Sequence, residues 1–212
     1  MKTRVVRAEE SGVVERALAV WQNGGLVAFP TDTVYGLSAL PTSDKALRRL
    51  WQTKGQDAGT FIALLFADIA ELPRFATLPD ALRPLVDRFW PGPLTLMLPR
   101  TEAVPRQIGE GTRVGVRIPA LPLACRLVQA AGGVLAVTSA SLPGRPAGRT
   151  AREALEQLDG KVDLVIDGGP APIGVVSTVV DGSRWPPVIL REGVISEADI
   201  RIALGLVRPR GK

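Results

Sequence analysis

Helical and strand periods alternate from one end of this sequence to the other. Stretches with apolar residues three or four positions apart follow short runs that are apolar throughout or alternate with polar residues. This alternation predicts an α/β fold rather than an all-helical or all-strand one. The expected strands are Arg4–Val6, Leu26–Phe29, Phe61–Phe66, Leu94–Leu98, Arg113–Ile118, Val134–Thr138, Asp163–Ile166, Ser177–Val180 and Val188–Leu190. The expected helices are Ser11–Trp21, with Ser11 as N-cap, Ser43–Gln52, Asp68–Phe75, Pro79–Phe89, Leu121–Ala131, Ala151–Leu158 and Ser196–Leu204.

The chain is expected to form a single domain over residues 1–212, since no repeat, low-complexity tract or convincing linker divides it. Its 46% hydrophobic and 22% charged residues are typical of a globular protein. The charged N-terminus lacks the apolar core of a signal peptide, and the longest apolar run, Phe61–Ala67, is too short to span a membrane. The single cysteine, Cys125, excludes an internal disulfide and favours a reducing compartment. We therefore expect a cytoplasmic protein without a membrane partner.

The sequence contains no histidine, and this removes whole classes of reaction. A Ser-His-Asp triad, a histidine general base and a histidine-ligated zinc ion are all excluded. Catalysis has to rest on carboxylates, lysine, arginine, hydroxyl groups, backbone amides or a hard cation held by oxygen ligands.

Positive charge is concentrated in one part of the chain. The segment from Arg100 to Arg152 holds eight arginines and two acidic residues, a charge of +6, whereas the whole chain carries +5. A surface of one sign raises the local concentration of anionic ligands such as nucleotides or RNA. The same segment is equally compatible with a solvated basic face, and the charge alone does not decide between them.

Polar side chains recur where the predicted strands end, which is where open α/β sheets bind ligands. The strand-end segments are Pro30–Leu37, Val137–Ser141, Val176–Val179 and Leu190–Gly193. Two further candidate segments are Lys54–Gly59, a glycine-flanked loop after the predicted helix Ser43–Gln52, and Val114–Pro119, which lies within a predicted strand. Each also has a purely structural interpretation, because such hydroxyl and carboxylate groups stabilise turns and an isolated lysine is usually solvated. Arg117 differs, since an arginine inside an alternating strand needs an anion or a polar partner.

Taken together and in this order, these segments resemble the threonylcarbamoyl-AMP synthase family, which has the YrdC-like fold. The family pattern is Pro-Thr-(Asp/Glu)-Thr-x-Tyr-Gly-Leu, Lys-x-Arg, Pro-Gly-Pro-x-Thr, Val-Arg-x-Pro, Thr-Ser-Ala-Asn, Ser-Thr-Val and Arg-x-Gly. The matching segments are Pro30–Leu37, Lys54, Pro91–Thr95, Val116–Pro119, Thr138–Ala140, Ser177–Val179 and Arg191–Gly193. The resemblance covers residues from about 10 to 200. It implies a twisted mixed open sheet with flanking helices and a concave basic surface.

The resemblance also implies an activity. Members of the family are nucleotidyltransferases that condense L-threonine, bicarbonate and ATP, assisted by Mg²⁺, into threonylcarbamoyl-AMP and pyrophosphate. Transfer proteins then use the product to modify tRNA, and tRNA or double-stranded RNA is a further expected partner. The residues implied for threonine are Thr31, Arg117, Ser139 and Ser177, and those implied for ATP are Lys54, Ser141 and Arg191, with Arg113 and Arg149 as additional lining. No protein nucleophile or metal ligand is expected, because the reaction needs orientation and charge neutralisation.

Two positions depart from the family pattern. Gln56 stands where the Lys-x-Arg loop has its arginine, which removes a charge-assisted contact worth about 1.5–3 kcal/mol. Ser141 replaces the asparagine of Thr-Ser-Ala-Asn. Because the chain ends at Lys212, we expect the short form of the family. The alternatives are a divergent paralogue of the YciO kind, which binds RNA or a nucleotide without synthase activity, and a carbamoyl-transfer domain, which the lack of zinc-finger cysteines disfavours.

Overall fold

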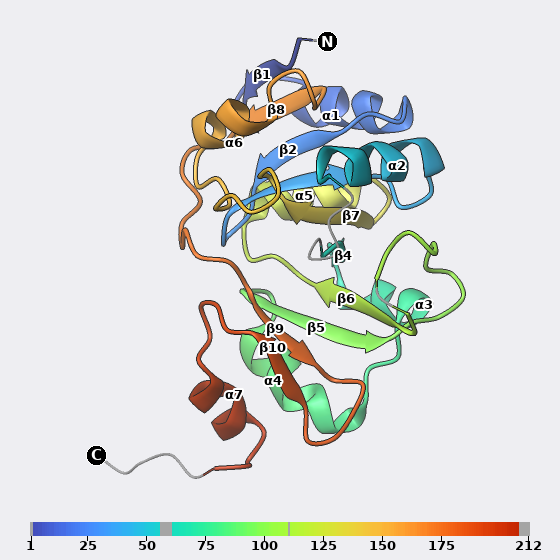
Figure 1. The fold of residues 1–212 in the computed structure, drawn as a ribbon, viewed down its shortest axis with the longest axis vertical. Coiled ribbons are helices and arrows are strands. Elements are labelled where there is room, and N and C mark those ends of the chain that lie inside the picture. The colour runs from blue at the N-terminus through green and yellow to red at the C-terminus, as the bar shows by residue number, and fades with distance from the viewer. Residues whose placement is uncertain (1, 56–60, 110, 208–212) are drawn as a thin grey trace.

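The computed structural model describes residues 2–55, 61–109 and 111–207, and it confirms the α/β architecture. Within those residues one mixed sheet has the strand order β1-β8-β2-β3-β7-β4-β6-β5-β9-β10 (Figure 1). The strands are β1 Arg4–Arg7, β2 Val27–Pro30, β3 Tyr35–Ala39, β4 Ala63–Phe66, β5 Leu94–Pro99, β6 Arg113–Arg117, β7 Val134–Ser139, β8 Leu164–Asp167, β9 Thr178–Asp181 and β10 Val188–Arg191. The α-helices are α1 Val13–Gln22, α2 Asp44–Thr53, α3 Leu72–Phe75, α4 Arg83–Phe89, α5 Pro122–Ala130, α6 Ala151–Leu158 and α7 Glu197–Ala203.

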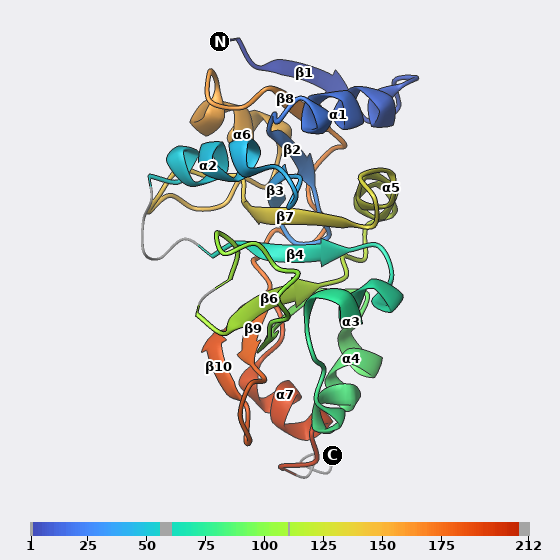
Figure 2. The same cartoon turned by 90° about the vertical axis from the view of Figure 1, so that its right-hand side faces the viewer.

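The sheet contains both parallel and antiparallel pairs, and strands that are distant in sequence are neighbours in it. β4 pairs in parallel with β6, and β5 with β9, whereas β7 runs antiparallel to both β3 and β4. Figure 2 shows α1 and α5 on one side of the upper strands and α2 and α6 on the other. The described residues contain no helix that is long and apolar enough to cross a membrane.

The structure corrects the sequence-based prediction in four places. The segment after Pro30 is not a loop leading to a helix, because Tyr35–Ala39 forms β3 and pairs antiparallel with β2. Its glycine and serine are poor strand formers, so a prediction based on strand propensities does not find this strand. Ser11 is not the N-cap of α1, since Gly12 takes that position with a φ of 74° and no side-chain cap. The predicted helix Asp68–Phe75 divides into a 3₁₀ turn, Ile69–Glu71, and α3, and the predicted helix Pro79–Phe89 divides into a 3₁₀ turn, Asp80–Leu82, and α4.

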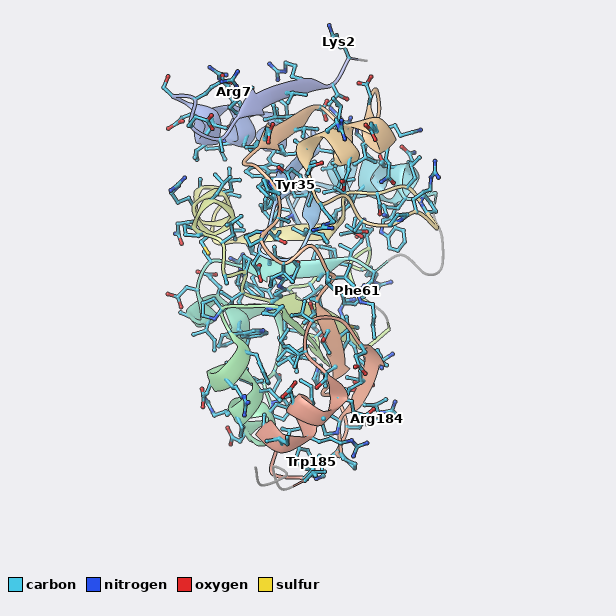
Figure 3. The ribbon with its side chains drawn as sticks, turned by 90° about the vertical axis from the view of Figure 1, so that its left-hand side faces the viewer. Lys2, Arg7, Tyr35, Phe61, Arg184 and Trp185 are labelled. Carbon is cyan, nitrogen blue, oxygen red and sulfur yellow. The ribbon has the colours of Figure 1, made fainter. Side chains whose placement is uncertain are left out.

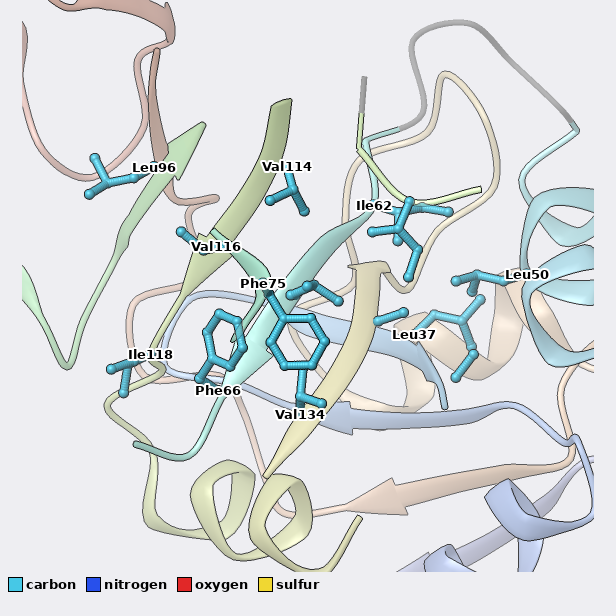
Figure 4. Packing of buried hydrophobic residues seen from close by; sticks show 14 of the residues in the cluster. Leu37, Leu50, Ile62, Phe66, Phe75, Leu96, Val114, Val116, Ile118 and Val134 are labelled. Atoms are coloured by element: carbon cyan, nitrogen blue, oxygen red, sulfur yellow. The ribbon is translucent and has the colours of Figure 1, made fainter. Parts of the chain in front are cut away.

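The two faces of the central strands have different roles. Ile62, Leu64 and Phe66 lie in the main hydrophobic core, together with Val114 and Val116 of β6. Figure 4 shows the Phe66 ring beside the Phe75 ring within this core. Because side chains alternate between the faces of a strand, the odd-numbered residues of β4 and β6 lie on the opposite face. That face opens onto a cavity.

Candidate active site

The cavity has a volume of about 210 Å³ and collects residues from distant parts of the chain. Seven of the nine residues expected at a ligand site line it: Thr31, Lys54, Arg117, Ser139, Ser141, Ser177 and Arg191. Arg113 and Arg149 do not line it. Four cations and no carboxylate belong to the described lining, so the cavity favours an anionic ligand.

The first polar cluster surrounds Arg117, which is only 6% exposed. Its Nη2 donates to Asp32 Oδ1 at 2.6 Å, its Nη1 to Thr33 Oγ1 at 2.9 Å, and its Nε to the Gly92 carbonyl at 2.9 Å. Burial lowers the pKa of Arg117 and the Asp32 carboxylate opposes that shift. A guanidinium stays charged in proteins, so a cation remains fixed beneath the cavity.

Residues of the turn between β2 and β3 both stabilise the turn and line the cavity. The Thr31 hydroxyl donates to the Val34 carbonyl at 2.7 Å and lies 3.0 Å from the Thr33 hydroxyl, so it stabilises the turn. Asp32 instead reaches across the sheet to Arg117. Its second oxygen, Oδ2, is buried and has no hydrogen-bond partner. The turn therefore holds the guanidinium in place and presents threonine hydroxyls to the cavity.

The second cluster surrounds Lys54, which caps the C-terminal end of α2 and is 5% exposed. Its Nζ donates to the backbone carbonyls of Ser139 and Ser141 and lies 3.3 and 3.4 Å from their hydroxyls. The two serine hydroxyls are 3.1 Å apart. Lys54 thus contacts the end of β7, and these contacts fix an ammonium at the cavity wall.

The third cluster joins Arg191, Ser177 and Thr95. The Arg191 Nη2 donates to the Ser177 carbonyl at 3.0 Å, and the Ser177 hydroxyl lies 2.9 Å from that of Thr95. Desolvation lowers the pKa of Arg191, and the positive charge of Arg117 lowers it further. Two guanidinium groups that repel each other across one cavity are both stabilised when an anion binds between them.

Close packing against the backbone explains why the Arg-x-Gly segment has a glycine at position 193, and Gly193→Ala tests this explanation. A Cβ at this position would lie 2.2 Å from the Val176 carbonyl oxygen and 2.7 Å from that of Ser177. Because those atoms are backbone, the substitution should displace Ser177 and destabilise the fold by about 1–3 kcal/mol. Urea unfolding should show the loss, whereas Glu192→Ala at the exposed neighbouring position should leave the midpoint unchanged. Equal midpoints for the two variants would contradict the packing argument.

The structure separates Arg113 and Arg149 from the cavity. Arg113 Nη1 pairs with Asp181 Oδ2 at 2.7 Å, and Arg149 is exposed next to Gly174. Gln56, the position of the missing family arginine, lies outside the described residues. Among the lining residues that the motifs did not single out are Phe61 and Arg145. Arg145 adds to the predicted basic segment, whereas no local pattern pointed to Phe61.

The described residues do not fit a resident metal ion. They contain no group of three or more aspartate, glutamate or cysteine side chains close enough to hold one. Hydroxyl groups are plentiful around the cavity, but carboxylate ligands, which Mg²⁺ prefers, are absent from the described lining.

The fold and the cavity define a mixed-sheet α/β protein with a small, cation-lined ligand site. Residues 19–193 match the Sua5_yciO_yrdC family model, described as "Telomere recombination". The chain belongs to this family, and the resemblance seen in its motifs is confirmed.

Individual relatives agree with the assignment. Threonylcarbamoyl-AMP synthase of Pyrococcus abyssi (strain GE5 / Orsay) is 41% identical over 189 residues, which cover 88% of this chain and 56% of the relative. The crystal structure of P. abyssi Sua5 complexed with L-threonine has a TM-score of 0.90 and 38% identity, covering 98% of this chain and 62% of that one. E. coli YciO has a TM-score of 0.84 and 28% identity, covering 93% and 99%. The chain therefore spans little more than half the length of the synthase relative.

Proposed function

We propose that this chain is a threonylcarbamoyl-AMP synthase, a nucleotidyltransferase that condenses L-threonine, bicarbonate and ATP and releases pyrophosphate. One observation carries the proposal: residues from eight separate segments, between Thr31 and Arg191, converge on one cavity lined by four cations and, among the described residues, no carboxylate. The synthase relative and the threonine-bound P. abyssi structure support the same assignment.

Threonine binds at the Arg117 cluster in this proposal. Three of the five N–H groups of Arg117 have protein acceptors, which leaves two for the substrate carboxylate. The hydroxyls of Thr31, Ser139 and Ser177 complete the amino-acid site. The charge-assisted contact with Arg117 orients threonine so that its amino group faces the rest of the cavity.

ATP binds at Lys54, Ser141 and Arg191. The threonine nitrogen attacks bicarbonate to form a carbamate with loss of water. A carbamate oxygen then attacks the α-phosphorus, and the bond from that phosphorus to the bridging oxygen of pyrophosphate breaks. Lys54 and Arg191 neutralise the negative charge of the phosphates during this displacement, so no protein nucleophile is required.

The remaining expectations follow from this activity. Mg²⁺ would enter with the triphosphate, since the described lining provides hydroxyls and no carboxylate. The product would pass to tRNA threonylcarbamoyl-transfer proteins in the cytoplasm, and tRNA or double-stranded RNA would be a direct ligand. Residues 1–212 would act as one domain.

Pyrophosphate release tests the proposal. We expect release from ATP only when L-threonine and bicarbonate are both present, and mass spectrometry should identify threonylcarbamoyl-AMP. L-Serine serves as a matched control, because it keeps the amino and carboxylate groups but lacks the methyl group. ATP turnover that is indifferent to threonine would overturn the proposal.

A binding protein without synthase chemistry is the second candidate function. The likeness to E. coli YciO over 99% of that chain and the departures at Gln56 and Ser141 favour it. For this candidate we expect tRNA binding that survives Lys54→Ala and weakens steeply as salt rises, since phosphate contacts release counterions. A flat salt response would exclude it.

A further inference from the structure

Two aromatic side chains line the cavity among the described residues, and they differ in what they offer a ligand. Tyr35 is fully buried, and its hydroxyl donates to the Gly169 carbonyl at 2.7 Å. Burial raises the pKa of Tyr35 to about 12. Phe61 is only partly buried, and Figure 3 places it midway along the molecule, between Tyr35 and Arg184. Phe61 is therefore the aromatic group that a ligand can reach.

The position of Phe61 follows from the sheet register. It lies two residues before Ala63 and four before Leu65, and all three line the cavity, whereas Ile62 points into the core. β4 pairs Ala63 with Gly115 of β6. A Cβ on Gly115 would lie 2.1 Å from Cζ of Phe61, so the tip of the ring occupies the space that the missing side chain leaves. Gly115 thus seats the ring at the cavity wall.

The size of the cavity indicates where a nucleobase would go. A volume of about 210 Å³ is smaller than the roughly 300–1,000 Å³ of sites that enclose a drug-sized ligand. The polar interior accommodates the amino acid and the phosphates, so the base has to rest on the apolar part of the lining. Val34, Ala63, Leu65 and Val137 of that part are buried, so the accessible apolar part of the described lining consists of Phe61, Leu142, Pro143 and Val176.

We propose that Phe61 is the side chain on which the nucleobase of the substrate rests, and that it determines affinity for the base. The inference builds on the proposed function, which supplies ATP as the ligand. Base–aromatic contacts commonly change affinity by about one to two orders of magnitude. Phe61 is then a binding residue for the base, separate from the cations that bind the phosphates.

Calorimetry with two ligands, ATP and inorganic tripolyphosphate, tests the proposal on the whole chain without threonine. Phe61→Ala should weaken ATP binding about 10- to 100-fold and leave tripolyphosphate binding unchanged. Phe61→Trp should retain ATP affinity, and ATP, but not tripolyphosphate, should quench its added fluorescence. Trp185→Ala, which removes an aromatic side chain that is 55% exposed and does not line the cavity, is the matched control and should bind both ligands normally.

A double-mutant cycle of Phe61 and Gly115 distinguishes loss of the ring contact from a general folding defect. Gly115→Ala should weaken ATP binding while Phe61 is present, because the new Cβ displaces the ring, and should have no further effect in a Phe61→Ala background. Equal losses for ATP and tripolyphosphate, or no loss for either, would overturn the proposal. If ATP does not bind the unaltered chain, both this proposal and the synthase function fail. Normal ATP binding without threonine-dependent turnover would overturn the synthase function alone.

Discussion

Arg117→Met should lower the free energy of unfolding by about 3–5 kcal/mol, because it leaves the Asp32 carboxylate buried without a counter-charge. The two side chains are each 7% exposed, and Asp32 Oδ2 already lacks a hydrogen-bond partner. Methionine fills much of the arginine volume, so the loss of stability comes from the unpaired Asp32 carboxylate and not from a cavity. Urea denaturation measures the change. Threonine-dependent pyrophosphate release should fall at least about 100-fold in the same variant.

Two further variants separate the stability effect from the functional one. Adding Asp32→Asn to Arg117→Met should restore more than half of the lost stability, since the buried charge is gone, while activity stays low. Arg113→Met on the same strand should cost less, because the buried Asp181 carboxylate still accepts from Ser183 and pairs with Arg184. A double variant as unstable as Arg117→Met would show that the buried carboxylate is not the cause.

The sequence located most of the site because polar residues at strand ends carry a local signal. Thr31 and Ser139 lie next to or at the carboxyl end of a strand, where an α/β sheet binds ligands, and Ser177 directly precedes the start of β9. The prediction that Arg117 has a polar partner is also confirmed, and that partner is Asp32. These inferences needed only periodicity and the burial cost of a charge.

The remaining features depend on tertiary contacts that a linear pattern does not contain. Arg113 lies four residues before Arg117 on β6, about 13 Å along an extended strand, which separates it from the cavity. Phe61 became a lining residue only because β4 pairs with β6 and places it over Gly115. The strand β3 was missed because its burial comes from neighbours on both sides and not from its own composition.

Lys54→Ala should reduce threonine-dependent pyrophosphate release by about 100- to 1,000-fold, the usual loss when one fixed charge-stabilising group is removed. Backbone carbonyls of Ser139 and Ser141 aim the ammonium at the cavity, so the phosphates lose a preorganised cation. The KM for ATP should rise, while calorimetry should show threonine binding close to normal. Steady-state kinetics at varied ATP measures the change.

Lys45→Ala is the matched control for this prediction. Lys45 belongs to the same helix, α2, but its side chain is exposed, donates to the Asn23 carbonyl and does not line the cavity. We expect its activity to equal that of the unaltered chain. Lys54→Ala also leaves buried carbonyls without a donor, which lowers the free energy of unfolding by about 1–3 kcal/mol. The activities of both variants are therefore compared at a temperature below the midpoints of their thermal unfolding. If the Lys54 variant is folded and retains more than a tenth of the activity, Lys54 supports the loop and does not act on the phosphates.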